Sequence, residues 1–268
     1  MLLSIALAPV SDWSRVIDDE RTDEADGFSS ATDGRAEVKT TLVIVTQFSG
    51  DSSSRWSNTE VEDLIFGSMS DMFTESSYGA IEVDGQVVGP VSLDNTGTSY
   101  EYISPGVGTL YRFTDGTGGT GVVNDALEAL VAIQPAFDFS QFDYLIVLVN
   151  GDWWRGLGGG GGNGYTLDVD YADGSDADVS FDGVSLVGEN TKSSGGGTGD
   201  GESEVWGRIA HEFGHQLGLG HVTGGYDHPF DLMGKLMPGH PSTFTKEGQL
   251  GFRDEAHWMT PSRIKTLS

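Results

Sequence analysis

Three of the chain's six histidines lie within one stretch of eleven residues, HEFGHQLGLGH, which runs from His211 to His221. Imidazole nitrogens bind zinc, and a catalytic zinc site takes three protein ligands while it keeps a fourth position open. A chain of this composition would contain H-E-x-x-H-x-x-G-x-x-H about 0.00002 times by chance. The stretch therefore indicates a zinc site rather than an accident of composition.

The spacing of this stretch fits a helix that presents two histidines on one side. If residues 203–217 are helical, His211 and His215 lie about 40° apart around the helix axis. Apolar residues recur every four positions on roughly the opposite side and give the helix a face to bury: Val205, Ile209, Phe213 and Leu217. We expect one side of this helix to hold the fold and the other side to face a cleft.

The rest of the stretch suits a third ligand and a general base. Gly218 lies where the C-terminus of a helix needs a residue that tolerates positive φ, so the chain can turn back sharply there. His221, three residues later, can then return to the metal. Glu212, next to the first ligand, is placed to take a proton from a water molecule rather than to bind the metal. It would later pass that proton to the leaving amine.

HEFGHQLGLGH resembles the extended zinc motif of the metzincin metallopeptidases. In that family a tight turn with a methionine lies beneath the metal, and FDLMG, with Met233 twelve residues after His221, looks like this turn. The resemblance implies zinc ligands His211, His215 and His221, general base Glu212, and Met233 as an apolar floor without a metal bond. It also implies an α+β fold, in which a metzincin-like mixed twisted sheet with packed helices lies above the cleft and a small C-terminal lower part begins near residue 219.

More narrowly, three segments resemble the immune-inhibitor-A-like peptidases: SYGAIEVDGQVVG, the FDLMG turn and FTKEGQLGF. We interpret the chain as a zinc-dependent endopeptidase. The alternative is a non-catalytic secreted binding or adhesion protein on the same scaffold, with a structural zinc or none. The intact Glu212 favours the enzyme, because a purely structural zinc site has no need of a base.

Composition limits the ligands and the partners. The chain contains no cysteine, so a metal must be held by His, Asp or Glu. Its formal net charge of −27, from 41 acidic and 14 basic residues, would repel nucleic acid and anionic membrane surfaces. We expect protein or peptide substrates and no nucleic-acid partner. A strongly acidic protein stays soluble where salt screens its self-repulsion, which fits an extracellular setting as well as an ordinary acidic protein.

Residues 1–39 are predicted to be a signal remnant and an acidic tail or propeptide, and residues 40–268 to be the peptidase domain. The opening MLLSIALAPV is apolar for about ten residues, whereas about 20 are needed to span a bilayer. It is either the end of a secretory signal or a strand or unstructured start. The following residues are polar and lack helical or strand periodicity. We expect a secreted protein without stable membrane insertion.

Periodicity predicts the elements that must position the zinc motif. Residues 40–48 and 143–150 are typical of buried strands, and residues 58–73 and 122–133 are typical of helices with one buried face. Residues 77–93 predict a strand, a tight turn at Asp84 and Gly85, and a second strand. The glycine-rich segments 157–164 and 188–202 predict mobile loops, with short strands between them around residues 165–170 and 179–187.

Acidic residues between the two glycine-rich segments offer a second metal chemistry. Their carboxylates alternate with small residues and could bind calcium, although no EF-hand spacing fits. The other interpretation is a solvated acidic face. The residues are Asp168, Asp170, Asp173, Asp176, Asp178 and Asp182.

Overall fold

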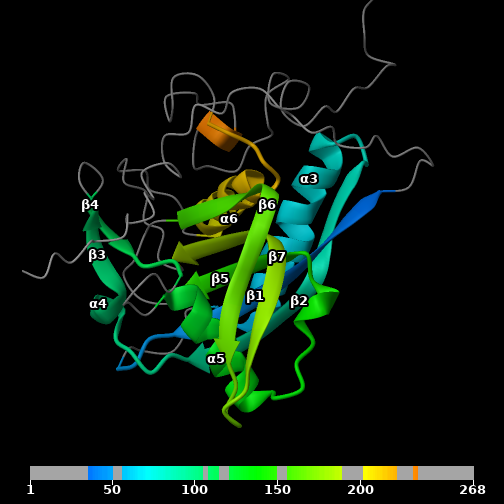
Figure 1. Cartoon of the computed structure of the whole chain (residues 1–268). Helices are drawn as coiled ribbons and strands as arrows, with labels where there is room; N and C mark the ends of the chain where they lie inside the picture. The colour runs from blue at the N-terminus through cyan, green and yellow to red at the C-terminus, as the bar shows by residue number, and fades with distance from the viewer. Residues whose placement is uncertain are drawn as a thin grey trace, which may run out of the picture.

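The computed structural model describes residues 36–50, 56–104, 108–114, 121–149, 156–188, 202–221 and 232–234. Within them, a five-stranded sheet has the order β2-β1-β5-β7-β6 (Figure 1). Four strands are parallel: β1 (Glu37–Gln47), β2 (Ile81–Ser92), β5 (Tyr144–Val149) and β7 (Asp176–Gly188). The edge strand β6 (Gly156–Asp170) runs antiparallel to β7. The fold is α+β with a mixed sheet, as predicted.

The central strands β1 and β5 are buried on both faces of the sheet, which explains their almost uninterrupted apolar sequences. Side chains alternate between two cores, so Leu42 and Ile44 lie in one core while Val43 and Val45 lie in the other. Both predicted strands are present. β1 begins at Glu37, three residues before the predicted start.

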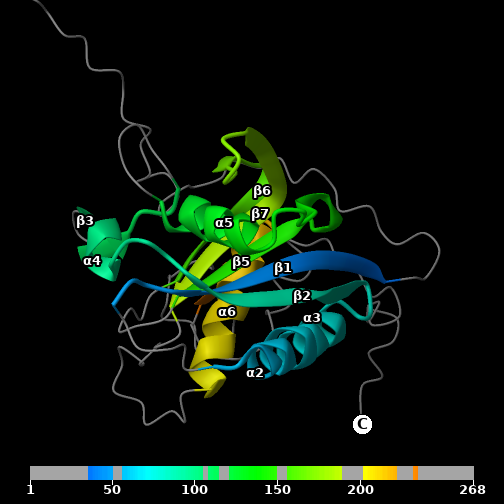
Figure 2. The same cartoon turned by 90° about the horizontal axis from the view of Figure 1, so that it is seen from below.

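Helices cover both faces of this sheet (Figure 2). One continuous helical run consists of α2 (Asn58–Glu62), the π-helical η1 (Asp63–Met69) and α3 (Ser70–Ser76). Ser57 begins this run with a capping box, in which its hydroxyl accepts from Glu60 N and the Glu60 carboxylate accepts from Ser57 N. On the other face, α5 (Val122–Ile133) has the predicted bounds. α6 (Glu202–Gln216) shares the face of α2 and α3 and packs against β6 and β7.

Residues 77–93 do not form the predicted hairpin. β2 is one continuous strand that pairs parallel with β1 and places Gly85 opposite Thr41. A Cβ atom at Gly85 would lie 1.9 Å from the carbonyl oxygen of Thr41. Glycine at this position therefore permits the close approach of two backbones. The predicted turn is wrong. An Asp-Gly pair is typical of tight turns, but its glycine can equally permit a close approach of two backbones within a sheet.

The glycine-rich residues 157–164 belong to β6 and are not the predicted loop. Residues 156–160 pair with β7 and, after a register shift, residues 165–170 pair with β7 again. The ladder between two strands uses backbone groups only, so a glycine run can form a strand when a neighbouring strand pairs with it. The strands predicted around residues 165–170 and 179–187 are confirmed as parts of β6 and β7, which together form an antiparallel hairpin. Residues 189–201, from the second predicted loop, lie outside the described residues.

Smaller elements complete the described chain. α4 (Gly97–Tyr100) leads into an antiparallel pair formed by β3 (Glu101–Ser104) and β4 (Gly108–Tyr111), and η2 (Phe139–Gln141) precedes β5. The rings of Tyr100 and Tyr111 pack against Phe48 at the end of β1. Among the described residues, no helix has both the length and the apolar character needed to cross a membrane. The predicted tail up to residue 35 and the predicted lower part, apart from residues 219–221 and 232–234, lie outside the described residues.

Candidate metal centre

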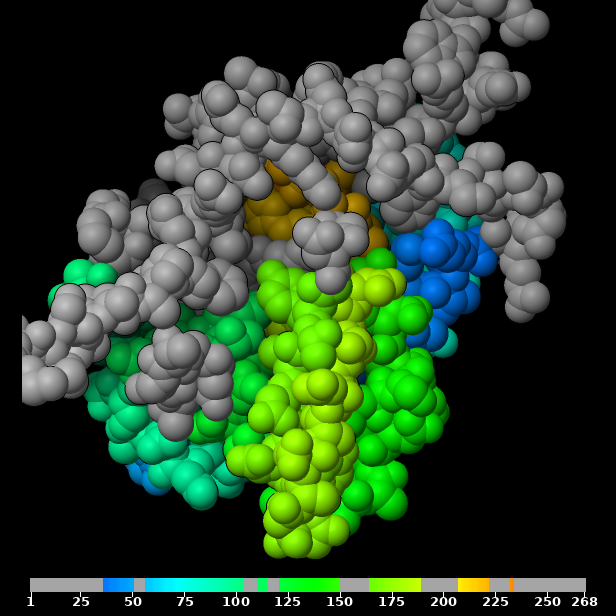
Figure 3. All heavy atoms as spheres, viewed as in Figure 1, coloured from blue at the N-terminus to red at the C-terminus, as the bar shows by residue number. Residues whose placement is uncertain are grey.

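Apolar side chains seat α6 on the sheet. Ile209, Phe213 and Leu217 are buried, as predicted for this face of the helix. The ring of Phe213 packs against Phe73 of α3 and Tyr144 of β5, with centroid separations of 5.4 and 5.3 Å. In the space-filling view, the gold surface of α6 lies directly above the ridge formed by β6 and β7 (Figure 3). The helix is thus held against the sheet while its histidines lie on another side.

The end of α6 turns the chain back toward the histidines. Gly218 has a φ of +85°, the left-handed conformation that the sequence predicts for it. Its N–H donates to the His215 carbonyl at 3.0 Å, and the N–H of Leu219 donates to the Gly214 carbonyl at 2.9 Å. These two bonds form a Schellman cap, which satisfies carbonyls at the helix end. His221 follows directly after this reversal.

His211, His215 and His221 converge in space. Their ligand nitrogens lie within 4.8 Å of one another, and Nε2 of His211 lies 3.3 Å from Nε2 of His221. Two nitrogen ligands of a tetrahedral zinc, each about 2.0–2.1 Å from the metal, would be about 3.3–3.4 Å apart. One pair therefore already has the spacing of two zinc ligands. Among the described residues, this is the one group of three such side chains that could hold a metal.

Backbone carbonyls orient two of the three rings. Nδ1 of His211 lies 2.7 Å from the carbonyl oxygen of Leu232, and Nδ1 of His215 lies 2.7 Å from that of Leu219. A carbonyl oxygen can only accept, so Nδ1 carries the hydrogen in both rings. Each neutral ring then has an unprotonated Nε2, whose lone pair is available to a metal. Metal-bound histidines in proteins characteristically make such a second hydrogen bond.

The histidines are held in the neutral form that a metal requires. Burial lowers the pKa of His211 well below its usual range, and the neighbouring His215 lowers it further. Burial, together with the proximity of His221, lowers the pKa of His215 to about 4, and burial also lowers the pKa of His221. Of the three, His211 is completely buried, whereas the sequence places it on a side that faces a cleft.

Glu212, the predicted general base, is 5% exposed. Burial raises the pKa of its carboxyl to about 7, and the charge of Arg208 opposes part of this rise. A carboxyl with a pKa near neutrality can both take up and return a proton under ordinary conditions. Arg208, itself buried, is absent from the sequence prediction. Its position one helical turn before Glu212 is the signal that could have identified it.

Met233 lies against the histidine helix. It belongs to the short helix η4 (Leu232–Gly234), orange in Figure 1, and is completely buried. A Cβ atom at Gly214 would lie 2.6 Å from the Met233 sulfur, so the absence of a side chain there lets the methionine approach the helix backbone. The neighbouring Leu232 supplies the carbonyl that orients His211. Leu232 and Met233, from the stretch predicted to be the methionine turn, therefore pack beside the zinc motif.

The acidic residues of the β6–β7 hairpin do not form a comparable group. Asp168 faces Asp178 and Asp170 faces Asp176 across the two strands, and all four are exposed. Asp173 accepts from the backbone N–H and the hydroxyl of Ser175, a contact within the hairpin turn. The described residues gather no three acidic side chains closely enough to hold a metal. The predicted calcium site is thus unsupported, and the aspartates form a solvated acidic face.

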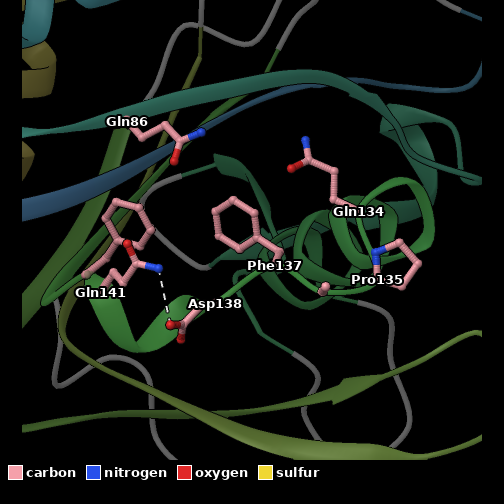
Figure 4. Close-up of a pocket in the computed structure, with 8 residues that line it drawn as sticks. Gln86, Gln134, Pro135, Phe137, Asp138 and Gln141 are labelled. Atoms are coloured by element: carbon pink, nitrogen blue, oxygen red, sulfur yellow. Dashed lines mark hydrogen bonds between the residues drawn. The ribbon is translucent and has the colours of Figure 1, made fainter.

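A hollow of about 430 Å³ lies at the C-terminal end of α5, on the opposite face of the sheet from α6 (Figure 4). Glutamines and phenylalanines line most of it. Its one carboxylate, Asp138, accepts from both the hydroxyl and the backbone N–H of Ser140 and from the amide of Gln141, which lowers its pKa. That carboxylate therefore stabilises the local turn, and the hollow contains none of the predicted site residues.

No protein family model matches the chain, and no curated protein matches it. Among the solved structures that are similar to it are the following three. Archaemetzincin from Methanopyrus kandleri is 14% identical, with 81% of this chain and 95% of that chain covered and a TM-score of 0.38. Metalloproteinase-II from Bacteroides fragilis is 19% identical, with 81% and 54% covered and a TM-score of 0.35. A zinc-dependent peptidase from Methanocorpusculum labreanum is 15% identical, with 70% and 86% covered and a TM-score of 0.27.

This chain spans about half the length of the Bacteroides fragilis structure. All three TM-scores lie below 0.5, a likeness too weak to carry a functional conclusion. None of the three proteins is described as immune-inhibitor-A-like. The segment FTKEGQLGF, which contributes to that narrower resemblance, lies outside the described residues.

Proposed function

We propose that the chain is a zinc-dependent endopeptidase of the metzincin type, with His211, His215 and His221 as zinc ligands and Glu212 as general base. The carrying observation is the convergence of three imidazoles, two of which are oriented through Nδ1 by backbone carbonyls. Glu212, the residue after His211, adds a buried carboxyl on the same helix. Three nitrogen donors without a thiolate suit a catalytic zinc, which keeps one position for water or substrate.

Zinc, when bound, would polarise the scissile carbonyl and lower the pKa of a water molecule. Glu212 removes one proton from the attacking water, whose oxygen forms the new bond to the carbonyl carbon. Glu212 then gives that proton to the departing nitrogen as the carbon–nitrogen bond breaks. One water is consumed, and the products are a carboxylic acid and an amine. The raised pKa of Glu212 suits a residue that must act first as base and then as acid.

Peptides are the proposed substrates because HEFGHQLGLGH and the turn at Met233 resemble those of the metzincins. We also propose a secreted setting, where salt screens the repulsion between acidic residues, although the net charge of −27 fits an ordinary acidic protein equally well. Methionine at position 233 would act as a buried apolar support beside the helix, since it is completely buried against Gly214.

The test is the substitution Glu212→Gln, compared with Glu62→Gln as a matched control on an exposed position of α2. Glutamine is close in size to glutamate, so zinc content and thermal unfolding should stay as in the parent. It cannot take up the proton, so casein cleavage should fall by about 10²–10⁴-fold or more. The Glu62→Gln variant should cleave casein at the parental rate.

A folded, zinc-loaded Glu212→Gln protein that cleaves casein as fast as the parent would refute this mechanism. A parent protein that holds zinc but cleaves neither casein nor shorter peptides would favour the non-catalytic binding protein instead.

A further inference from the structure

Gln216 connects the histidine helix to the centre of the sheet. It is the last residue of α6, is 2% exposed and directly follows His215. Its side-chain nitrogen donates to the carbonyl oxygen of Leu145 in β5 at 3.0 Å and to the hydroxyl of Ser185 in β7 at 2.7 Å. The amide thus bridges two adjacent parallel strands from above, at the end of the helix that carries two of the histidines.

The sheet has a gap for this contact at Gly183. A Cβ atom there would lie 2.6 Å from Cβ of Gln216 and 3.1 Å from its Cα. Gly183 also pairs with Tyr144 of β5, so the gap lies directly beside the strand whose carbonyl accepts the hydrogen bond from the Gln216 amide. The helix therefore reaches the sheet more closely here than a position with a side chain would allow. The missing side chain at Gly183 sets how closely α6 approaches the sheet at residue 216, and the two hydrogen bonds donated by the Gln216 amide restrain the orientation of the helix there.

The amide oxygen of Gln216 makes no hydrogen bond within the part of the chain that the structure describes. A buried acceptor without a partner destabilises the folded state, because it has lost its hydrogen bonds to water. An apolar side chain of similar size would avoid that cost and still fill the space. Overall stability therefore does not explain a glutamine here, whereas directional donation to two strands does.

We propose that Gln216 is a positioning residue, which sets the rotation and depth of α6 so that the three histidines converge. Ring nitrogens lie about 6 Å from a helix axis, so a rotation of about 20° would move Nε2 by about 2 Å. Zinc–ligand distances tolerate only about 0.2 Å. A residue that restrains helix rotation therefore controls zinc affinity without touching the metal. This inference rests on the proposed zinc site.

The test is the substitution Gln216→Met, which keeps the volume and removes the two donated bonds. Zinc affinity is measured by competition with a chelator, and thermal unfolding is measured on the metal-free protein. The dissociation constant for zinc should rise about 10–100-fold, the range found when partners of metal ligands are removed. The unfolding temperature of the metal-free protein should stay at or above the parental value. At saturating zinc, kcat should fall while KM stays the same.

Ser185→Ala removes one of the two bonds and leaves the bond to Leu145, so it should weaken zinc binding by a smaller factor. In the double variant, the effect should not exceed that of Gln216→Met alone. Asn124→Leu is the matched control, because Asn124 is also buried and donates to a strand carbonyl, that of Asp168, from α5 on the opposite face. It should leave zinc affinity unchanged.

Parental zinc affinity in folded Gln216→Met overturns the positioning role while the zinc site stands. If that variant does not fold, parental affinity in Ser185→Ala overturns it. An equal loss in Asn124→Leu also overturns it, because the effect would then be general. A parent chain that binds no zinc refutes the proposed function itself.

Discussion

At the scale of single residues, carbonyl groups decide which nitrogen His211 and His215 can offer. The carbonyl of Leu219 comes from the turn that ends α6, and the carbonyl of Leu232 comes from a segment 21 residues beyond His211. Both hold the hydrogen at Nδ1 and leave Nε2 for a metal. The helix cap and the segment around Met233 are therefore parts of the candidate site, although neither supplies a side-chain ligand.

Gly214→Ala tests the packing of that segment. The new Cβ would lie 2.6 Å from the Met233 sulfur and would push η4, with the carbonyl that orients His211, away from the helix. We expect a loss of about 1–3 kcal/mol in the free energy of unfolding and weaker zinc binding. Thermal unfolding and chelator competition measure the two effects.

Gly67→Ala is the matched control, since a Cβ there meets nothing within 4 Å. Alanine in that helical position should stabilise the protein by about 0.5–1 kcal/mol. If Gly214→Ala is as stable as Gly67→Ala, Met233 does not pack against the helix as described.

Sequence could predict the ligand and base candidates because zinc chemistry restricts both residue type and spacing. It predicted the sharp turn at Gly218 for the same reason, since few residues adopt positive φ there. It missed Arg208 and Gln216, whose roles depend on neighbours that only the folded chain brings near. A polar residue next to the apolar position Leu217 was the available signal for Gln216.

At the scale of elements, glycine determines how closely backbones approach. Gly85 lets β2 pair with β1, and Gly183 lets α6 approach β7. At Gly85 a side chain would meet backbone atoms of Thr41, and at Gly183 it would meet Cβ, Cγ and Cα of Gln216. Glycine here serves packing between elements and not turns within the chain.

Gly85→Ala should therefore destabilise the sheet. Its Cβ would lie 1.9 Å from the Thr41 carbonyl oxygen, so the two strands would have to separate. We expect a loss of at least about 3 kcal/mol in chemical unfolding, at or beyond the upper end for overpacking. If the free energy of unfolding falls by less than it does for a glycine-to-alanine substitution in an exposed turn, the result would instead favour the hairpin that the sequence alone suggests.

Sequence patterns predicted correctly those elements that are specified by their own residues. Helix α5 has the predicted bounds because its apolar spacing, glycine start and following proline all agree. The parallel pairing of β2 with β1 could not be predicted, because β1 lies about 40 residues earlier in the chain and the sequence of β2 does not indicate which strand pairs with it. The same holds for glycine residues 157–164, which form a strand because β7 lies beside them.

At the scale of the whole molecule, charge opposes compactness. The net charge is −27, and the exposed face of the β6–β7 hairpin adds facing pairs of aspartates. Like charges directly opposite each other on neighbouring strands are destabilising. At 0.1 M ionic strength the Debye length is about 10 Å, so salt largely screens the repulsion between exposed charges farther apart than this and weakens it between nearer ones. The fold should therefore be more stable in salty solution than in dilute buffer.

Sodium chloride should raise the unfolding temperature, and Asp178→Asn should raise it in dilute buffer by relieving the pair with Asp168. The gain should be about 0.2–1 kcal/mol and should shrink as salt is added. Glu82→Gln is the matched control, because it removes one exposed charge that faces Val38 rather than an acid. Equal gains from the two variants would show that only net charge matters, and that the facing pairs do not.

The central claim is that three histidines bind zinc, and X-ray absorption at the zinc edge of the purified protein tests it most directly. The spectrum should show one zinc per chain with three imidazole nitrogens at about 2.0–2.1 Å. Changing His211, His215 and His221 together to alanine should abolish zinc binding. Changing the chain's other three histidines, His228, His240 and His257, should leave the spectrum as it is. Zinc retained with imidazole ligands in the first variant, or lost in the second, would contradict the claim.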